Sequence, residues 1–348
     1  MSPAISYAAV NTKLRAILGL FLSNEDYMRL ISMDSVADIA RYLKQTHYSQ
    51  ALEGVSAEAI HRGELEVILR RYSVDLLMRL RHYFKDEARK FLNVLYMRFE
   101  VEDLKLLIRA LFTGQDLAEA GSSLVYIGRY GDLDIKRLIS SKSFSELVDS
   151  LKGSPYYPYL YPLTLKDNTE NQFRVEMALD LAYAAIYKRH MEKLTPAEQE
   201  MIIRIQGMRA DLLNLQLIYR GIKFYRLPGD ILLNYTLDFN GSLSHARLKE
   251  LCQCRDEAEL VEKMRNTRYN FLFDHKKTRD IFMERRMNRY LYYKLLKIRR
   301  MNRMDIVQSV IFFDLLEIEI RDIITIVENI RYHNEDPERI KSCLIRSL

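Results

Sequence analysis

Residues that interrupt helices are scarce in this sequence. It has 12 glycines and 7 prolines among 348 residues, and neither type occurs from 64 to 113 or from 242 to 336. Both stretches are long enough for several helices and are rich in leucine, arginine, lysine, glutamate and methionine, which favour the helical state. So few turn-forming residues argue against a fold of short strands joined by turns. The sequence therefore predicts an all-α chain.

Cysteines and long apolar runs are also scarce. Three cysteines, Cys252, Cys254 and Cys343, argue against a disulfide scaffold and favour a reducing, cytoplasmic compartment. The first two lie too close together, and are too few, for a structural zinc site with its four ligands. Apolar runs such as residues 16–22 are far shorter than the roughly 20 residues of a membrane span. The N-terminus lacks the basic start and apolar core of a secretory signal.

The common signatures of catalysis are missing as well. No glycine-rich phosphate-binding pattern occurs, and the seven histidines are scattered without the i, i+4 spacing of metal ligands. We therefore predict no catalytic, cofactor-binding or metal-binding residues. Apolar residues make up 48% of the chain and charged residues 29%, which excludes wholesale disorder. The net charge of +6 permits contact with an acidic partner or anionic lipid without demanding either.

Three looser stretches interrupt the helical pattern. Glycines cluster from 114 to 131, a segment rich in proline and tyrosine from 153 to 162 excludes a regular helix, and a third break runs from 227 to 241. These breaks divide the chain into three parts of similar length. The predicted units are helical repeats over residues 1–118, 119–229 and 230–348.

A short segment recurs once in each part. Residues 30–43, 138–151 and 251–264 align in register at offsets of 108 and 113 residues. Each copy has an N-cap residue followed three positions later by an acid, which is a capping box or its aspartate variant. Apolar residues then follow at helical spacing. The N-cap positions are Ser35, Ser143 and Asp256, and the acids are Asp38, Glu146 and Glu259.

A second element follows about 70 residues later in each copy. It places two polar residues one helical turn apart, ahead of apolar residues at i, i+3, i+4 and i+7. Paired acids can act in general acid–base catalysis, but these recur once per copy, and an asparagine replaces an acid in the second. Structural polar contacts or a partner surface explain them better. The candidate partner-facing residues are Glu100, Asp103, Asp211, Asn214, Glu319 and Asp322.

Two elements that repeat in the same order at nearly one period indicate a triplication. The predicted fold is three homologous helical bundles, each with a capped short helix and at least two long helices. Such units either pack around a pseudo-threefold axis or extend as a solenoid.

The strongest charge feature spans residues 276–303, where eleven lysines and arginines accompany only two acids, with three tyrosines interleaved. One interpretation is a basic helix that meets an acidic partner, lipid head groups or nucleic acid, although no nucleic-acid motif accompanies it. The other is a solvated helix that pairs with acids of the next helix, predicted from about 305 to 332 and apolar enough to be buried. The candidate membrane- or partner-facing residues are Arg285, Arg286, Arg289, Lys297, Arg299 and Arg300.

Two segments carry a family resemblance. They are Tyr-Met-Arg-Phe-Glu-Val-Glu-Asp-Leu-Lys at 96–105, with its later echoes, and Tyr-Ala-Ala-Val-Asn-Thr-Lys-Leu-Arg-Ala at 7–16. With the triplication, the whole chain resembles the C subunit of the archaeal and bacterial V/A-type ATPases, whose eukaryotic homologue is the V-ATPase d subunit. One departure is Glu328, which stands where the earlier copies have Arg109 and Arg220.

The resemblance implies a funnel-shaped, non-catalytic subunit without cofactors, present in one copy per complex. It would lie peripherally at the cytoplasmic face of the membrane, as a socket between the central-stalk subunits of D and F type and the proteolipid c/K ring. Torque for ATP-driven ion transport or ATP synthesis would pass through it. The six partner-facing candidates would lie on its inner wall, the basic segment could touch lipid head groups, and nucleic acid would not be a partner.

Three other functions compete with this one. The first is a soluble all-helical scaffold or adaptor unrelated to ion transport, which co-purification with a proteolipid ring would exclude. The second is an enzyme on an unfamiliar helical fold, which requires a deep pocket with convergent polar groups. The third is a nucleic-acid binder that uses the basic segment and shows steep salt dependence.

Overall fold

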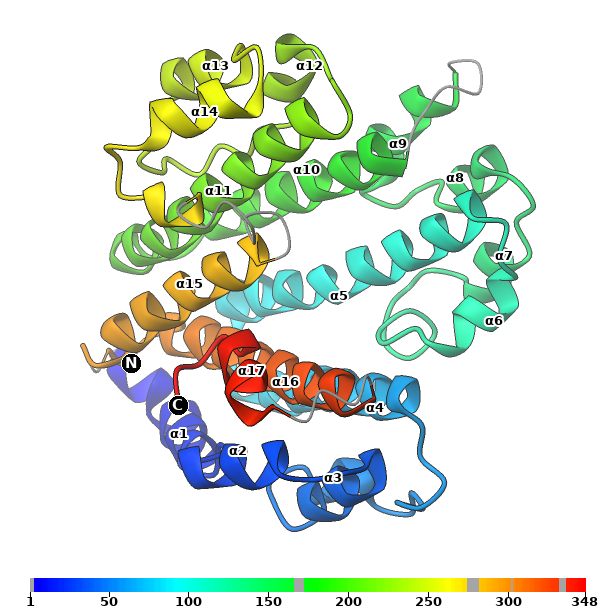
Figure 1. Ribbon diagram of the computed structural model, residues 1–348, viewed down its shortest axis with the longest axis vertical. Coiled ribbons are helices and arrows are strands. Elements are labelled where there is room, and N and C mark those ends of the chain that lie inside the picture. The colour runs from blue at the N-terminus through cyan, green and yellow to red at the C-terminus, as the bar shows by residue number, and fades with distance from the viewer. Residues whose placement is uncertain (1–2, 166–171, 274–281, 302, 332–335) are drawn as a thin grey trace. The chain divides into compact units, whose positions relative to one another are not determined.

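A computed structural model describes residues 3–165, 172–273, 282–301, 303–331 and 336–348. Within these ranges the regular structure is entirely helical, so the predicted all-α class is confirmed (Figure 1). The chain divides into two compact units. The first holds residues 1–22 and 33–194, and the second holds residues 23–32 and 195–348. The arrangement of three homologous bundles around a common axis stays a prediction.

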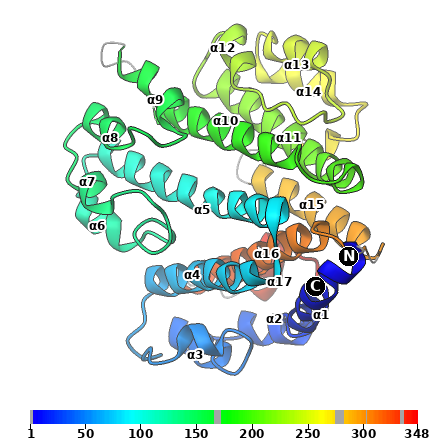
Figure 2. The ribbon, with the colours of Figure 1, turned by 180° about the vertical axis from the view of Figure 1, so that it is seen from behind.

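The first unit is built on three long helices, with shorter ones at their ends. Its α-helices are α1 (Pro3–Leu18), α3 (Val36–Leu43), α4 (Arg62–Leu80), α5 (Asp86–Phe112), α6 (Leu117–Ser122), α7 (Ile135–Ile139), α8 (Phe144–Ser150), α9 (Tyr157–Thr164) and α10 (Gln172–Met191). Two 3₁₀ turns, η1 (Ser49–Leu52) and η2 (Arg81–Tyr83), flank α4. Figures 1 and 2 both show α6, α7 and α8 gathered at the C-terminal end of α5.

The second unit is also built on three long helices. Its elements are α2 (Asn24–Ile31), α11 (Pro196–Lys223), α12 (Gly229–Asn234), α13 (His245–Cys252), α14 (Glu257–Met264), η3 (Asn270–Leu272), α15 (Met283–Arg299), α16 (Val307–Arg331) and α17 (Pro337–Cys343). Helices α12, α13 and α14 lie beside α11, and α2 packs on α16 and α17. The N-terminal α2 and the C-terminal α17 are therefore neighbours in this unit (Figure 2).

The three predicted N-caps are confirmed. Ser35 accepts a hydrogen bond from the Asp38 amide (3.1 Å) at the start of α3. Ser143 does the same for α8 at 3.2 Å, and Asp256 for α14 at 2.8 Å. Each bond satisfies a backbone amide that the first helical turn leaves without a partner, and such a cap contributes about 1 kcal/mol. The repeated capping pattern thus marks three real helix starts.

The predicted absence of a regular helix at 153–162 is wrong. Helix α9 begins at Tyr157, with Pro158 in its first turn and Pro162 inside it. A proline in the first turn removes only an amide that has no intrahelical partner. Because α9 has only eight residues, Pro162 already lies in the last turn, where the helix ends two residues later. The second proline thus limits the length of the helix instead of preventing it.

Polar and ionic contacts join α5 to α10 in the first unit. Lys105, whose side chain is only 8% exposed, donates to Asp180 at 2.6 Å. One turn further on, Arg109 binds both carboxylate oxygens of Glu176 (2.9 and 2.7 Å). A bidentate arginine–carboxylate pair of this kind constrains both distance and orientation. The two helices are therefore held in one register, and the Phe91 and Tyr187 rings also meet between them with centroids 5.0 Å apart.

Helix α16 is the most apolar long helix of the second unit. Its described side chains are buried around much of the circumference, including Ile311, Phe312 and Leu316, each fully enclosed. Full burial of such a side chain contributes about 1.5–3 kcal/mol. The predicted buried helix is confirmed over this range, while its predicted end, Tyr332, lies outside the described residues. None of the helices in the described ranges combines the length and the apolar character that crossing a bilayer requires.

Candidate functional site

The carboxylate of Asp103, in α5, holds a loop of its own unit. Its Oδ1 accepts from the amide of Val125 (2.9 Å), and its Oδ2 accepts from the amides of Tyr126 (2.7 Å) and Ile127 (2.8 Å). The side chain is only 3% exposed. Burial raises the pKa of Asp103, and the three amides oppose that rise because they favour the charged form. The carboxylate thus closes the loop after α6 onto α5.

Asn214 plays a similar part in α11. Its Oδ1 accepts from the amide of Leu237 (2.8 Å), and its Nδ2 donates to the carbonyl of the same residue (2.9 Å). An asparagine side chain carries one acceptor and a two-hydrogen donor, so it can satisfy both backbone groups of one residue. The loop after α12 is therefore held by a neutral side chain at this point.

Asp322 holds the C-terminal segment against α16. Its Oδ1 accepts from the amide of Ile345 (2.6 Å) and its Oδ2 from the amide of Arg346 (3.1 Å). Burial raises the pKa of Asp322 to about 6, although the two amides and nearby arginines favour the charge. From α15, Arg289 donates to the carbonyls of Leu344 and Ile345. The C-terminal backbone is thus bound on both its donor and its acceptor groups.

The three loop-holding residues share one spacing. Asp103 binds amides 22 to 24 residues ahead of it, Asn214 binds a residue 23 ahead, and Asp322 binds amides 23 and 24 ahead. In each case the residue stands in the second half of a long helix, and the segment that it binds comes after the next short helix, which is α6, α12 or α17. A common origin of the three helices would explain the spacing, and it stays a prediction.

One turn before Asn214 in α11, Asp211 also holds loop backbone. It accepts from the amides of Ser242 (2.6 Å) and Leu243 (3.2 Å) and from the Tyr269 hydroxyl (2.6 Å). Burial, and next the bond to Asp211, raise the pKa of Tyr269 well above its ordinary value. A Cβ at Gly241 would lie 2.2 Å from Asp211 Oδ1. Glycine is therefore required where the loop meets the carboxylate.

Glu100 and Glu319 stand at the same position in α5 and α16. Both are buried, with 8% and 4% exposure. Burial raises the pKa of Glu100 to about 7, and the charges of Asp132 and Asp103 add to the rise. The Tyr156 hydroxyl lies close enough to Glu100 to oppose this rise in the pKa, although the two groups lack hydrogen-bond geometry. In the second unit, Tyr27 of α2 is enclosed, and its pKa is raised by burial and next by the charge of Glu319.

The six partner-facing candidates lie as pairs one turn apart on three long helices. Their side chains are buried within the units to which those helices belong. Their exposed fractions run from 0% for Asp322 to 8% for Glu100. Their described contacts are with loops and tyrosines of the same unit. In the isolated chain the loops, and not these side chains, reach the surface. Direct contact of the six side chains with a partner stays a prediction.

The six basic candidates divide into two groups. Arg286 donates twice to the Leu272 carbonyl (3.1 and 2.8 Å), Arg289 binds the C-terminal carbonyls, and Arg285 lies over the Phe282 ring at 4.6 Å. These three are partly or fully buried. The other three are exposed at the C-terminal end of α15, and they are Lys297, Arg299 and Arg300.

The alternative of pairing with the next helix holds in part. Arg303, at the end of the basic segment, pairs with Asp305 at 2.6 Å. Asp314 of α16, however, pairs with Arg209 of α11 (2.7 Å), and the ion pair between Glu284 and Arg321 (2.9 Å) joins an acid of α15 to a base of α16. Residues 276–281 of the basic segment lie outside the described residues. The exposed basic end of α15 is thus not neutralised by the ion pairs found on α16.

Two kinds of residue in these sites escaped sequence reasoning. The first kind is the glycines that let a loop approach a carboxylate, Gly131 beside Glu100 and Gly241 beside Asp211. They stand 31 and 30 residues after Glu100 and Asp211, so an alignment of the repeated segments could have identified them as equivalent glycines. The second kind is the tyrosines, such as Tyr269, which lies beyond the end of α14. No cluster of side chains in the described ranges has the composition and geometry to hold a metal ion.

The fold and these contacts define an all-helical protein whose buried polar side chains hold loops of the same chain in place. Its sequence matches the model of the ATP synthase (C/AC39) subunit family over residues 10–342, and the chain belongs to that family. It is 26% identical over 347 residues to the C subunit of the A-type ATP synthase of Methanocaldococcus jannaschii, covering 97% of this chain and 86% of the relative.

More distant relatives carry the same name. The C subunit of the A-type ATP synthase of Methanosarcina acetivorans is 20% identical over 264 residues, which are 76% of this chain and 71% of the relative. The protein of that name from Pyrococcus horikoshii is 22% identical over 269 residues, which are 76% and 68% of the two chains. The match therefore extends through both units.

Proposed function

We propose that this chain is the non-catalytic coupling subunit of a V/A-type rotary ATPase. It joins the central-stalk subunits of D and F type to the proteolipid c/K ring, in one copy per complex, at the cytoplasmic face of the membrane. The observation that carries the proposal is the family match over residues 10–342, together with relatives named as the C subunit of A-type ATP synthases.

A coupling subunit must transmit torque without yielding, and the loop contacts support that role. Helices α5, α11 and α16 have 27, 28 and 25 residues, and each binds the loop that follows it through a buried polar side chain. A loop tied by charge-assisted hydrogen bonds loses most of its freedom to move. The four residues that bind loop backbone, Asp103, Asp211, Asn214 and Asp322, therefore act through the loops, which form the rigid surface that the shaft meets. In this proposal the three helices belong to three related bundles around a common axis.

The exposed end of α15 suits the membrane side of such a socket. Lys297, Arg299 and Arg300 are exposed there, and Tyr293 and Met301 are exposed on the same end of the helix. Basic residues are attracted to anionic head groups by about 1 kcal/mol each near the surface. Tyrosine favours the interface between head groups and water. This end of α15 faces lipid head groups or the polar loops of the proteolipid ring.

The proposal is tested by affinity purification of the tagged chain from native membranes, followed by mass spectrometry. The expected result is co-purification of the shaft subunits and the proteolipid. Removal of the chain from the complex is expected to leave ATP hydrolysis by the catalytic part but to abolish ATP-driven ion transport in vesicles. Recovery of the chain without any ATPase subunit would contradict the proposal and favour a scaffold unrelated to ion transport.

A further inference from the structure

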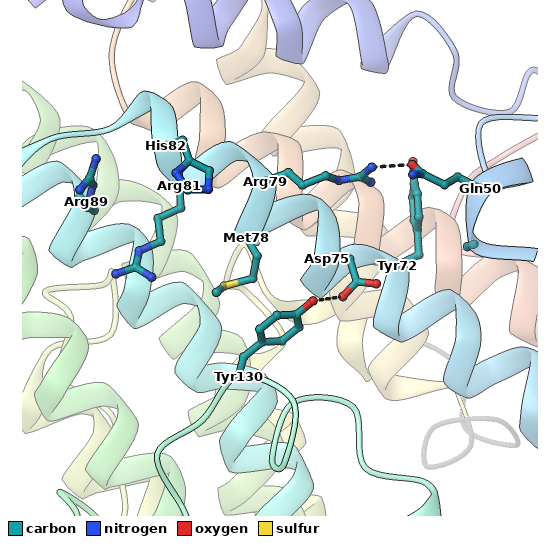
Figure 3. A pocket seen from close by; sticks show the side chains of 10 residues that line it. Gln50, Tyr72, Asp75, Met78, Arg79, Arg81, His82, Arg89 and Tyr130 are labelled. Carbon is teal, nitrogen blue, oxygen red and sulfur yellow. Dashed lines mark hydrogen bonds between the residues drawn. The ribbon is translucent and has the colours of Figure 1, made fainter.

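The first unit contains an open cleft of about 780 Å³ at the C-terminal end of α4 (Figure 3). Its walls come from α4, from the turns η1 and η2, from the start of α5 and from the loop after α6. Four basic side chains line it, Arg79, Arg81, His82 and Arg89. Three of them are exposed and Arg81 is half-buried, so the cleft presents its positive charge to the outside.

The acid of the cleft does not balance this charge. Asp75 accepts from the Tyr130 hydroxyl (2.5 Å) and pairs with Arg129 (3.2 Å), which lies beside the cleft. Figure 3 shows the Tyr130 hydroxyl directed at Asp75 and the Arg79 side chain directed at Gln50. The Asp75 carboxylate is therefore already bound to Tyr130 and Arg129. The lining of the cleft offers no second acid to its basic side chains.

The basic side chains themselves are bound only to neutral groups, where they are bound at all. Arg79 donates to the Gln50 amide oxygen, and Arg89 donates through Nε to the Phe84 carbonyl (2.7 Å). Among the described residues, Arg81 makes neither a side-chain hydrogen bond nor an ion pair. A guanidinium has five N–H donors in a planar fork that matches a carboxylate. Most of the donors in the cleft are thus available to an incoming anion.

We propose that this cleft binds an acidic segment of another subunit in the assembled complex, with at least two carboxylates bound by Arg81 and Arg89. The proposal rests on the proposed function, which places the chain among other subunits. Pockets for small ligands enclose most of the ligand and are mainly apolar, whereas this cleft is wide and open with charged walls. Met78 lines it between the charged groups and supplies an apolar contact for a side chain of the segment. A protein segment therefore fits better than a small anion.

The test uses the full chain in the assembled complex. Met78 is replaced by the photoreactive amino acid p-benzoylphenylalanine, the complex is purified and irradiated, and the cross-linked peptide is sequenced. The expected partner is a segment with at least two aspartates or glutamates near the cross-link. The double variant Arg81→Gln with Arg89→Gln lowers the cross-link yield roughly tenfold, because both carboxylate contacts are lost. The variant Arg137→Gln, an exposed arginine of the same unit, leaves it unchanged.

Three results would overturn the proposal. They are an assembled complex without a cross-link, a cross-linked segment without acids, and a yield that the double variant does not lower. A chain that fails to assemble with ATPase subunits before irradiation contradicts the proposed function as well. An assembled complex without the acidic contact contradicts the cleft proposal only.

Discussion

Tyr269 donates a 2.6 Å hydrogen bond to Asp211, a residue 58 positions earlier in the chain. Both side chains are buried, at 1% and 2% exposure. The tyrosine lies beyond the end of α14, directly before η3, and the aspartate lies in the middle of α11, so this bond joins two parts of the chain that the sequence alone presents as separate. The same carboxylate also holds two loop amides. A single side chain thus connects a long helix, the loop after α12 and the segment after α14.

The first prediction concerns this bond. Tyr269→Phe removes the hydroxyl donor and leaves a buried carboxylate oxygen with one partner fewer. Loss of a bond to a buried charged group costs about 1–3 kcal/mol, so the variant is expected to unfold at a lower temperature and a lower urea concentration. The matched control is Tyr159→Phe, at a tyrosine of α9 that is 36% exposed. Equal stability of Tyr269→Phe and the wild-type chain would show that the bond contributes nothing.

The second prediction concerns the glycine beside the same carboxylate. A Cβ in Gly241→Ala would lie 2.2 Å from Asp211 Oδ1 and 2.7 Å from the Gly207 carbonyl. The loop must shift or the carboxylate must lose its amides, which costs about 1–3 kcal/mol. Thermal unfolding measures this change. In Gly63→Ala, by contrast, the added Cβ meets nothing within 4 Å, and that variant is expected to retain or slightly raise the melting temperature.

The third prediction concerns pH. Burial raises the pKa of Glu100 to about 7, while an unfolded glutamate titrates at about 4.3. The folded state therefore holds its proton more tightly, so this group destabilises the fold progressively as the pH rises from about 4 to about 7. Glu100→Gln removes that titration. The drop in unfolding free energy between about pH 5 and pH 8 is expected to shrink by about 1–3 kcal/mol, as measured by urea unfolding.

The control for the pH experiment is Glu119→Gln, at an exposed glutamate of α6. This variant is expected to keep the pH dependence of the wild-type chain. If Glu100→Gln kept it as well, the burial of Glu100 would not be the cause of the pH dependence.

The fourth prediction concerns the C-terminal segment. Arg289→Met removes the donors that bind the carbonyls of Leu344 and Ile345. Asp322 still binds the amides, so the segment is expected to loosen without unfolding α16. Hydrogen exchange at residues 344–346 should become faster by roughly tenfold, the effect of about 1.4 kcal/mol. Arg299→Met, at an exposed arginine of the same helix, should leave the exchange unchanged.

Local features were predicted well from the sequence. Ser35, Ser143 and Asp256 were assigned as N-caps because a cap binds an amide only two or three positions away, within reach of sequence patterns. The buried character of α16 followed from apolar residues around its circumference. Helix α9 was missed because proline rules describe a long helix, and in a helix of eight residues both prolines fall near an end.

The candidate site was predicted in its positions but not in its contacts. The pairs Glu100 with Asp103 and Glu319 with Asp322 were found from repetition, which shows that a position matters without showing what it touches. Exposure of the basic candidates was likewise mixed, because Arg286 turns back to the Leu272 carbonyl while Arg299 points to solvent. The cleft around Arg81 was not predicted, since its walls come from four separate stretches of chain.

The sequence by itself determined the helical class, the helix starts and the recurrence of polar residues on long helices, because propensity, capping and periodicity act over a few residues. Only the tertiary structure decided that Asp103 and Asp322 are buried and bind backbone amides 22 to 24 residues ahead. The physical reason is that a carboxylate leaves water only where enough donors converge on it. That convergence requires the loop to fold back onto the helix, and no local pattern in the chain specifies it.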